Sequence, residues 1–404
     1  MKRVILPILL LIILQLSCKE NVITPPDNKP QGYQEDLPWP SLADSPWPMN
    51  HHDPQNTGRS KFIGPINGNI IWIDSVEYMQ ASASFINDSL IVIAENNRIK
   101  CISLSGTEKW TYNIGTQVFL SPLVTADSMI ISGGSSADGK LLAINFDGSK
   151  RWELNLGTPI QSSGVNIDKM GNIYVVAGFN LFAVSKEGVI KWILGDHRIN
   201  PAAASSFSPD GNTIYISALN PSLLAVNTSN GMIKWEFGSA SLLASPFVDS
   251  QGNIYFIPKP DASNSSNATL FSIENNWNIR WQFDFNVDPS AGFYGATGTI
   301  DKEGNIYFAF DTLYALDYQG KLKWKKFLAG TSDAPLICDI NSNIYVSAQS
   351  MINSEVFLSK YSSIGGELWR REFTHHQVGL SPVIGKNGTI IFIPWRADRI
   401  YYLN

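Results

Sequence analysis

The sequence predicts an all-β fold: a single eight-bladed β-propeller of four-stranded antiparallel blades, closed by an N-terminal strand that completes the last blade. Three observations lead to this prediction. A Gly-x-x-x-Trp phrase recurs about every forty residues, the segments between its copies have the pattern of short strands and turns, and the two ends of the repeated region complement each other. Repeats of this length are typical of propellers and solenoids, in which each repeat is one structural unit.

Eight tryptophans mark the repeats. In most copies a glycine stands four residues before the tryptophan, as in "GSKRW" and "GVIKW", whereas the copy "WNIRW" has Trp277 in the glycine position. The tryptophans that end the eight copies are Trp72, Trp110, Trp152, Trp192, Trp235, Trp281, Trp324 and Trp369.

The residues between successive tryptophans predict the other three strands of each blade. A segment of small residues such as "ASPFVD" comes first, and a turn of the Asp-x-x-Gly-Asn type and two apolar strands follow. Branched and aromatic residues favour strands, while Gly, Asn and Asp favour turns. Small residues suit the innermost strands, which converge on the axis. We interpret the Asp-x-x-Gly-Asn sequence as a hairpin corner rather than a calcium loop.

The ends of the repeated region decide the topology. It begins with a tryptophan strand, "GNIIWIDSV", that has no partner strands before it, and it ends with three strands and no further Gly-x-x-x-Trp copy. If the first strand completes the last blade, all eight blades are whole and the ring has no open end that could pair with other chains.

Composition excludes one class of partner and argues against a disulfide-based fold. Lys and Arg total 30 against 35 Asp and Glu, and no dense basic run is present. Nucleic acid is therefore not an expected partner, because phosphate binding needs clustered positive charge. Cys101 and Cys338 are far apart and lie in apolar strand-like runs, so we expect buried free thiols.

The chain opens with the pattern of an export signal. Two basic residues precede an unbroken apolar run, and the small residue Ser17 precedes Cys18. We predict a signal peptide over residues 1–17 and lipidation of Cys18, which stands where bacterial lipoprotein signals place their modified cysteine. The two residues before Ser17 depart from that pattern, so ordinary secretion with cleavage nearby stays open as the alternative.

Two further parts follow the signal. Residues 18–45 are rich in Pro and polar residues and predict an extended tether, and residues 46–404 contain the propeller. The expected location is outside the cytoplasm, as a membrane-anchored lipoprotein in the periplasm, at the outer membrane or on the cell surface.

The repeats resemble the PQQ-like, or quinoprotein alcohol dehydrogenase-like, β-propeller family. The resemblance lies in a small residue nine positions before the tryptophan, as in Ala143 to Trp152 and Ala183 to Trp192. It implies that each tryptophan wedges between neighbouring blades. The stretch "SPWPMNHHDPQNTGRS" also resembles the Trp-led entry segment of this family, with Trp47, Asp53, Thr57, Arg59 and Ser60 in the matching places, and implies a segment that lies across one face of the disc.

The resemblance implies two classes of function. Enzymes of this fold bind pyrroloquinoline quinone over the central channel with a calcium ion, an arginine and a catalytic aspartate, and the alcohol dehydrogenases add a disulfide between adjacent cysteines. No residue of this chain matches a cofactor ligand, and it has no adjacent cysteines. We therefore expect no catalysis, no cofactor and no metal.

The expected function is a monomeric interaction or assembly scaffold for protein partners at the cell envelope. Two alternatives stay open. One is a periplasmic PQQ-dependent dehydrogenase with PQQ and calcium, and the other is an envelope polysaccharide-binding module that uses exposed aromatic residues such as Tyr294 and Trp395.

Loops that lead from a tryptophan strand to the next inner strand should surround the mouth of the channel. Polar loops are usual at the rim of any propeller, so a binding role for their side chains is a hypothesis. The candidate contacts for a small ligand or peptide are Glu77, Tyr78, His197, Arg198, Asp288, Tyr294, Asp333, His375 and His376.

The histidine pairs at positions 51–52 and 375–376 could come together when the ring closes. Zinc or copper accepts such imidazoles. Adjacent side chains of an extended chain point to opposite sides, however, so two pairs do not readily supply four convergent ligands. We predict no metal site.

Overall fold

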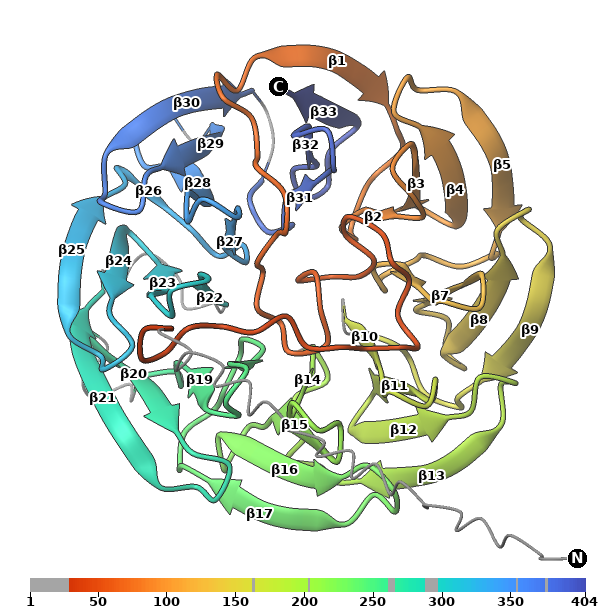
Figure 1. Cartoon of the computed structure of the whole chain (residues 1–404). Helices are drawn as coiled ribbons and strands as arrows, with labels where there is room; N and C mark the ends of the chain where they lie inside the picture. Colours follow the sequence, from red (N-terminus) through yellow and green to blue (C-terminus); the bar gives the residue numbers. More distant parts are fainter. Residues whose placement is uncertain are drawn as a thin grey trace, which may run out of the picture. The chain divides into compact units, whose positions relative to one another are not determined.

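Short runs of branched and aromatic residues, separated by Gly, Asn and Asp turns, form the strands of the computed structural model (Figure 1). The structure describes residues 29–161, 164–202, 204–260, 266–287, 297–353, 355–374 and 377–404. The described residues form strands and no helices, and the strands make eight antiparallel sheets around a central axis. The predicted eight-bladed propeller is confirmed.

Each blade runs from a short inner strand to an outer strand. The inner strands are β2 (Ser84–Phe85), β6 (Leu123–Val124), β10 (Val165–Ile167), β14 (Ser206–Phe207), β18 (Phe247–Val248), β22 (Thr299–Ile300), β27 (Ile337–Cys338) and β31 (Val383–Ile384). The second strands are β3 (Leu90–Glu95), β7 (Met129–Gly134), β11 (Ile173–Ala177), β15 (Thr213–Ser217), β19 (Ile254–Phe256), β23 (Ile306–Ala309), β28 (Ile344–Ser350) and β32 (Ile390–Phe392). The short strand β26 (Gly330–Thr331) also pairs with β28.

The two outer positions of each blade hold longer strands. The third strands are β4 (Arg98–Ser103), β8 (Lys140–Asn145), β12 (Asn180–Val184), β16 (Leu223–Asn227), β20 (Asn267–Ile273), β24 (Thr312–Leu316), β29 (Val356–Tyr361) and β33 (Arg399–Leu403). The outer strands are β5 (Glu108–Asn113), β9 (Lys150–Asn155), β13 (Ile190–Gly195), β17 (Ile233–Phe237), β21 (Ile279–Asn286), β25 (Leu322–Phe327), β30 (Glu367–Phe373) and β1 (Ile70–Ser75).

The ring closes as predicted. The outer strand β1 comes from the N-terminal part of the chain and pairs antiparallel with β33 at the C-terminus, with Trp72 opposite Tyr402 and Ser75 opposite Arg399. Asn69 and Asn404 extend this pairing through reciprocal backbone hydrogen bonds of 2.9 Å. Residues 31–404 thus form one compact unit.

The Asp-x-x-Gly-Asn turns are self-contained corners. In the third blade Asp168 Oδ1 accepts the backbone N–H groups of Met170 and Asn172, both at 2.9 Å. Its Oδ2 accepts the Asn172 amide at 2.7 Å and the Tyr174 hydroxyl at 3.0 Å. Asp249, Asp301 and Asp339 are bound in the same way. Both carboxylate oxygens therefore already have donors within the hairpin, as the corner interpretation expects.

Each repeat tryptophan reaches the next blade. Trp192 on β13 donates its indole N–H to the carbonyl of Thr228 at 3.0 Å, and the glycine that begins the next copy, Gly231, lies against its ring. A Cβ built on Gly231, whose φ is +73°, would lie 2.6 Å from the indole. Glycine is thus needed both for the turn and for the close approach. Equivalent indole hydrogen bonds come from Trp110, Trp152, Trp235, Trp281, Trp324 and Trp369.

The chain packs on the propeller before residue 46, where the sequence places the end of the tether. Gln34 is buried, Trp39 donates its indole N–H to Ile167 O at 2.8 Å, and Leu42 forms a bridge with Thr125. No helix among the described residues could span a membrane. The predicted signal peptide and the first part of the predicted tether, residues 18–28, lie outside the described residues.

Candidate functional site

Residues 47–60 lie across the centre of one face of the ring (Figure 1), and we call them the hub segment. Their carbonyls accept backbone hydrogen bonds from the inner strands of six blades. The donor and acceptor residues are Phe85 and Trp47 (2.7 Å), Val124 and Pro48 (2.8 Å), Phe207 and Pro54 (2.8 Å), Val248 and Gln55 (2.9 Å), Ile300 and Thr57 (3.3 Å), and Cys338 and Gly58 (2.9 Å). Each donor is the last residue of its inner strand. The hub segment therefore covers one end of the central axis.

Asp53 organises the tight turn inside the hub segment. Its Oδ1 accepts the backbone N–H groups of Gln55 at 3.1 Å and Thr57 at 3.0 Å, and its Oδ2 accepts the Thr57 hydroxyl. His52 Nδ1 lies 3.3 Å from the same oxygen. Burial alone would raise the pKa of Asp53, but the contacts with His52 and Thr57 outweigh it and hold the pKa below its usual value.

Asn56 joins two blades at the centre of the face. Its φ is +56°, in the left-handed region that asparagine tolerates better than most residues. The side-chain amide donates to Ser205 O at 2.9 Å and to Pro246 O at 3.0 Å, on neighbouring blades. The Asn56 side chain thus helps to hold the ring together.

His51 and His52 also serve the hub segment. His51 is 1% exposed, and its carbonyl accepts the N–H groups of Asp53 and Gly58, both at 3.0 Å. Burial lowers the pKa of His51 to about 4. The His52 ring lies edge-on to Trp47, with ring centroids 4.9 Å apart. Among the described residues no group of three or more His, Cys, Asp or Glu side chains could hold a metal ion.

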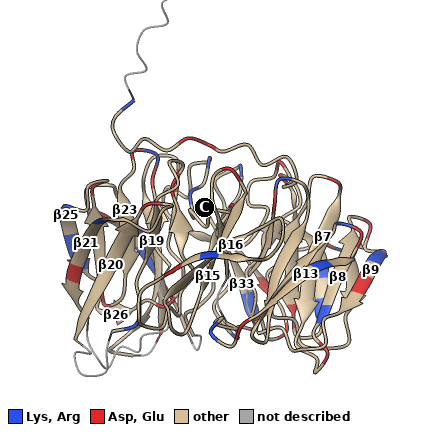
Figure 2. Cartoon of the chain, turned by 90° about the horizontal axis from the view of Figure 1, so that it is seen from below, with Lys and Arg blue, Asp and Glu red and all other residues tan. Residues whose placement is uncertain are grey.

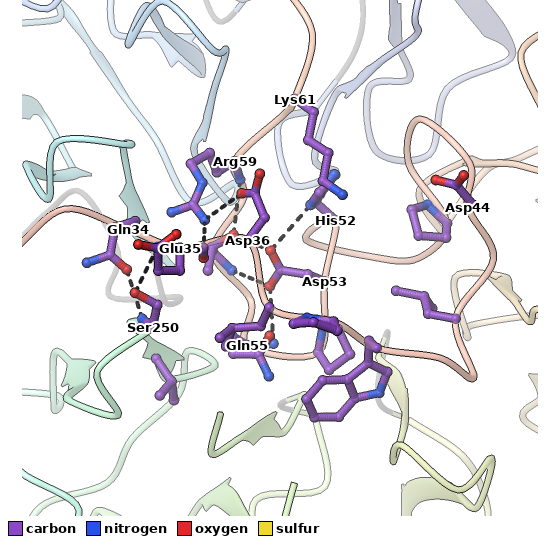
Figure 3. A pocket seen from close by; sticks show the side chains of 18 of the residues that line it. Gln34, Glu35, Asp36, Asp44, His52, Asp53, Gln55, Arg59, Lys61 and Ser250 are labelled. Atoms are coloured by element: carbon purple, nitrogen blue, oxygen red, sulfur yellow. Dashed lines mark hydrogen bonds and ion pairs between the residues drawn. The ribbon is translucent and has the colours of Figure 1, made fainter. Parts of the chain in front are cut away.

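A cavity of about 250 Å³ lies beside the hub segment (Figure 3). It is lined mostly by the N-terminal segment, and Val248 and Ser250 come from the fifth blade. The charged residues in its wall are Glu35, Asp36, Asp44, Asp53, Arg59 and Lys61. Half of the lining residues belong to the predicted tether. The signal that could have found them is the proline-bounded aromatic "LPWP" within that tether.

Arg59 connects the two halves of this cavity wall. Its Nη2 donates to Glu35 O at 3.2 Å and lies 3.3 Å from Asp36 Oδ1, while Lys302 Nζ lies 3.1 Å from the other Asp36 oxygen. Burial would raise the pKa of Asp36, but Arg59 and Lys302 outweigh it and lower that pKa. The cavity thus presents carboxylates and cationic donors together, a combination suited to a neutral ligand rich in hydroxyl groups.

The predicted rim residues lie on the other face. The hub segment covers the C-terminal ends of the inner strands, whereas the predicted loops enter these strands at their N-terminal ends. Figure 2 shows the N-terminal segment over one face of the ring and β26, which belongs to such a loop, at the other. The rim candidates and the hub segment therefore form two separate surfaces.

Several rim side chains are already paired with charged residues of their own loop or of a nearby strand. Arg198 lies 2.8 Å from Asp196 and 2.7 Å from Glu236, so its guanidinium is held by two carboxylates. The neighbouring His197 side chain is 92% exposed. Glu77 lies 2.6 Å from Arg98.

Tyr78 and Asp333 differ from these pairs. The hydroxyl of Tyr78 accepts a hydrogen bond from Gln80 at 3.2 Å. Asp333 Oδ1 has no hydrogen-bond partner, and burial raises the pKa of Asp333 to about 6.

The structure does not bring the described rim candidates together into one site. The other candidates, Cys18, Asp288, Tyr294, His375 and His376, lie outside the described residues.

The residues that line the cavity beside the hub segment do not suit pyrroloquinoline quinone. That cofactor carries several carboxylates, whereas four carboxylate side chains and only two cationic ones line the cavity. Arg59 is already engaged with Glu35 and Asp36.

The repeats of this chain are similar to those of known proteins. A family model described as outer membrane protein assembly factor BamB matches residues 61–256. The predicted resemblance to the PQQ-like β-propeller repeat family is confirmed. No curated protein matches the chain by sequence.

Solved structures with PQQ-like repeats and other propellers share the fold. BamB from Moraxella catarrhalis is 14% identical, with a TM-score of 0.64 over 83% of this chain and 99% of that one. A quinohemoprotein alcohol dehydrogenase from Comamonas testosteroni is 13% identical, with a TM-score of 0.66 over 88% of this chain and 80% of that one. The C-terminal WD40 domain of Sif2 is 10% identical, with a TM-score of 0.65 over 83% and 99%. Identities this low establish the fold alone.

Proposed function

We propose that the chain is a non-catalytic lipoprotein of the cell envelope whose propeller is a platform for assembling protein partners. The observation that carries the proposal is the pairing of a family match to BamB, an outer membrane protein assembly factor, with a structural match over 99% of the BamB chain.

The hub segment supports the same proposal. It fills one end of the axis with main-chain hydrogen bonds to six inner strands, and its polar side chains are engaged in holding the turn. Such a rigid centre suits a scaffold, because a preformed surface loses little conformational freedom when a partner binds.

Site-specific photocrosslinking in the native membrane tests the platform. A photoreactive residue placed at His197, on the face of the rim loops, or at Met170, which is 81% exposed on the hub face, should give a discrete crosslinked product from at least one face. Absence of any product at both positions and at several neighbours would contradict the platform.

Two further measurements separate this proposal from its alternatives. Replacement of Cys18 by serine should release the protein from the membrane fraction if that cysteine carries the anchor. A saturable thermal shift with pyrroloquinoline quinone and calcium, accompanied by a quinone absorbance band, would instead establish the dehydrogenase.

A second candidate function follows from the cavity beside the hub segment. Its wall places carboxylates such as Asp44 near cationic donors such as Lys61, and Trp39 adds an aromatic surface. Donors and acceptors beside an aromatic ring suit a sugar, so this observation favours the polysaccharide-binding alternative. Titration with envelope polysaccharide fragments, compared between the wild type and Lys61→Ala, tests it: binding that the variant does not weaken counts against the cavity.

A further inference from the structure

One outer strand differs from the other seven. In each of β5, β9, β13, β17, β21, β25 and β30 a lysine or arginine stands directly beside the repeat tryptophan. These residues are Lys109, Arg151, Lys191, Lys234, Arg280, Lys323 and Arg370. Lys and Arg mark outer strands such as β9 and β25 in Figure 2. In β1 the corresponding neighbours of Trp72 are Ile71 and Ile73.

The apolar side chains of β1 face solvent. Ile70 is 40% exposed, Ile71 56%, Trp72 48% and Ile73 45%. Trp72 also lacks the contact that the other repeat tryptophans make: within the described part of the chain its indole N–H has no acceptor, whereas the other seven donate to a carbonyl of the next blade or of the N-terminal segment. An exposed tryptophan among isoleucines is a frequent centre of protein–protein contact.

The backbone of β1 is open on the same side. Val76 N donates to Asp398 O, which continues the pairing with β33. Because N–H groups alternate along a strand, those of Ile73 and Ser75 face away from β33. The Ser75 N–H donates to Asp74 Oδ1 at 3.0 Å, so the N–H of Ile73 is the open one of these two. Charged residues on an edge normally prevent pairing with another chain. The seven other outer strands have this protection, and β1 has none before Asp74.

We propose that β1 pairs antiparallel with β1 of a second copy of this chain, which joins two propellers edge to edge. The sequence of the strand is nearly symmetrical about Trp72, which suits a two-fold interface, because the same patch must complement itself. The backbone is less regular, since its register against β33 shifts between Ile70 and Trp72. A two-fold axis through Trp72 sets Ile71 opposite Ile73 of the second copy and Trp72 opposite its counterpart. It sets Asp74 opposite Ile70, so no like charges meet.

This pairing goes beyond the scaffold function and contradicts the monomer expected from the sequence alone. A second copy supplies partners for backbone groups of β1 that face away from β33. It also covers isoleucines and a tryptophan that no other outer strand exposes as a continuous group of four.

Sedimentation of the purified protein over a wide concentration range tests the proposal. The wild type should change from monomer to dimer as concentration rises, and Ile73→Lys, which places a positive charge beside Trp72, should remain monomeric. Ile193→Lys is the matched control. It makes the same change at the same position of β13, where Ile193 is 52% exposed, and should dimerise as the wild type does.

Disulfide trapping tests the register. Mixed copies of Ile71→Cys and Ile73→Cys should form a crosslinked dimer under mild oxidation, whereas either variant alone should form much less. A wild type that stays monomeric at every concentration would overturn the proposal, and so would a dimer that Ile73→Lys leaves intact. A monomer that instead binds an unrelated apolar strand peptide through β1 would replace the second copy with a different partner.

Discussion

His51 should make the protein less stable in mild acid. The side chain is 1% exposed, and neither ring nitrogen has a hydrogen-bond partner. Burial lowers the pKa of His51 from 6.5 to about 4. Because the unfolded chain binds this proton more tightly than the folded protein, protonation favours unfolding. The free energy of unfolding is therefore unaffected by His51 above pH 6.5 and falls as the pH decreases from 6.5 to 4.

The size of the loss follows from the shift. Each pH unit within this window costs about 1.4 kcal/mol, so His51 should remove about 2 kcal/mol between pH 6.5 and 5, and about 3 kcal/mol by pH 4. The carboxylates of depressed pKa, such as Asp53, act at lower pH, because they lose their contribution only as the pH falls from their unfolded toward their folded pKa.

Urea unfolding at pH 7 and pH 5 measures this loss. His51→Asn removes the titrating ring, and asparagine tolerates the φ of +59° at this position. The variant should lose about 2 kcal/mol less than the wild type between the two pH values. His52→Asn keeps His51 and should behave as the wild type does. Equal losses in wild type and His51→Asn would refute the reasoning, since His51 would then not be kept neutral by burial.

Three other substitutions or treatments test the packing. Asn56→Ala should cost about 2–4 kcal/mol in urea unfolding, because it removes two blade-joining hydrogen bonds and strains a left-handed residue, whereas Asn56→Gly should lose only the hydrogen bonds. Gly231→Ala should cost about 1–3 kcal/mol more than Gly157→Ala, which has a similar φ but no atom within 4 Å of the added Cβ. Cys338 is buried and its pKa is raised, so mass spectrometry should find it unalkylated until the protein unfolds.

The fold could be predicted because every blade repeats the same physical requirements. The Asp-x-x-Gly-Asn corner recurs in three blades, and Asp339 begins a variant of it. The tryptophan recurs in eight copies and the glycine that lies against the tryptophan of the preceding blade recurs in seven, so their period survives when single copies degenerate. Trp277 shows this tolerance: it takes the glycine position with a φ of +64° and lies against Trp235 with ring centroids 6.2 Å apart. The closure of the ring could also be predicted, because the repeated region begins with one strand that has no partners and ends with one blade that has no outer strand.

The candidate site could be predicted only in part. The sequence identified the entry segment and its position over one face, but composition assigned residues before 46 to a tether. The prolines and polar residues there give no sign that side chains such as Gln34 and Trp39 are buried, because the partners of these side chains lie far away in the chain. The rim candidates were chosen by loop position alone. Pairings such as Arg198 with Glu236 depend on how neighbouring loops meet, which no local pattern reveals.

The N-terminal segment links the hub to ring closure. Between the hub segment and β1, Pro65 O accepts Lys360 Nζ at 2.8 Å and the Trp369 indole at 3.3 Å, which replaces the hairpin contact of an ordinary blade. Gly64 N also donates to Asp339 Oδ2 at 3.2 Å. These partners are among the last parts of the chain to be made, so the segment can be fixed only after the seventh blade exists. Contacts so distant in sequence form late, because the intervening chain must be ordered first. Until β1 pairs with β33, the last blade lacks its outer strand, and the same late step therefore completes the fold and presents the outer edge of β1.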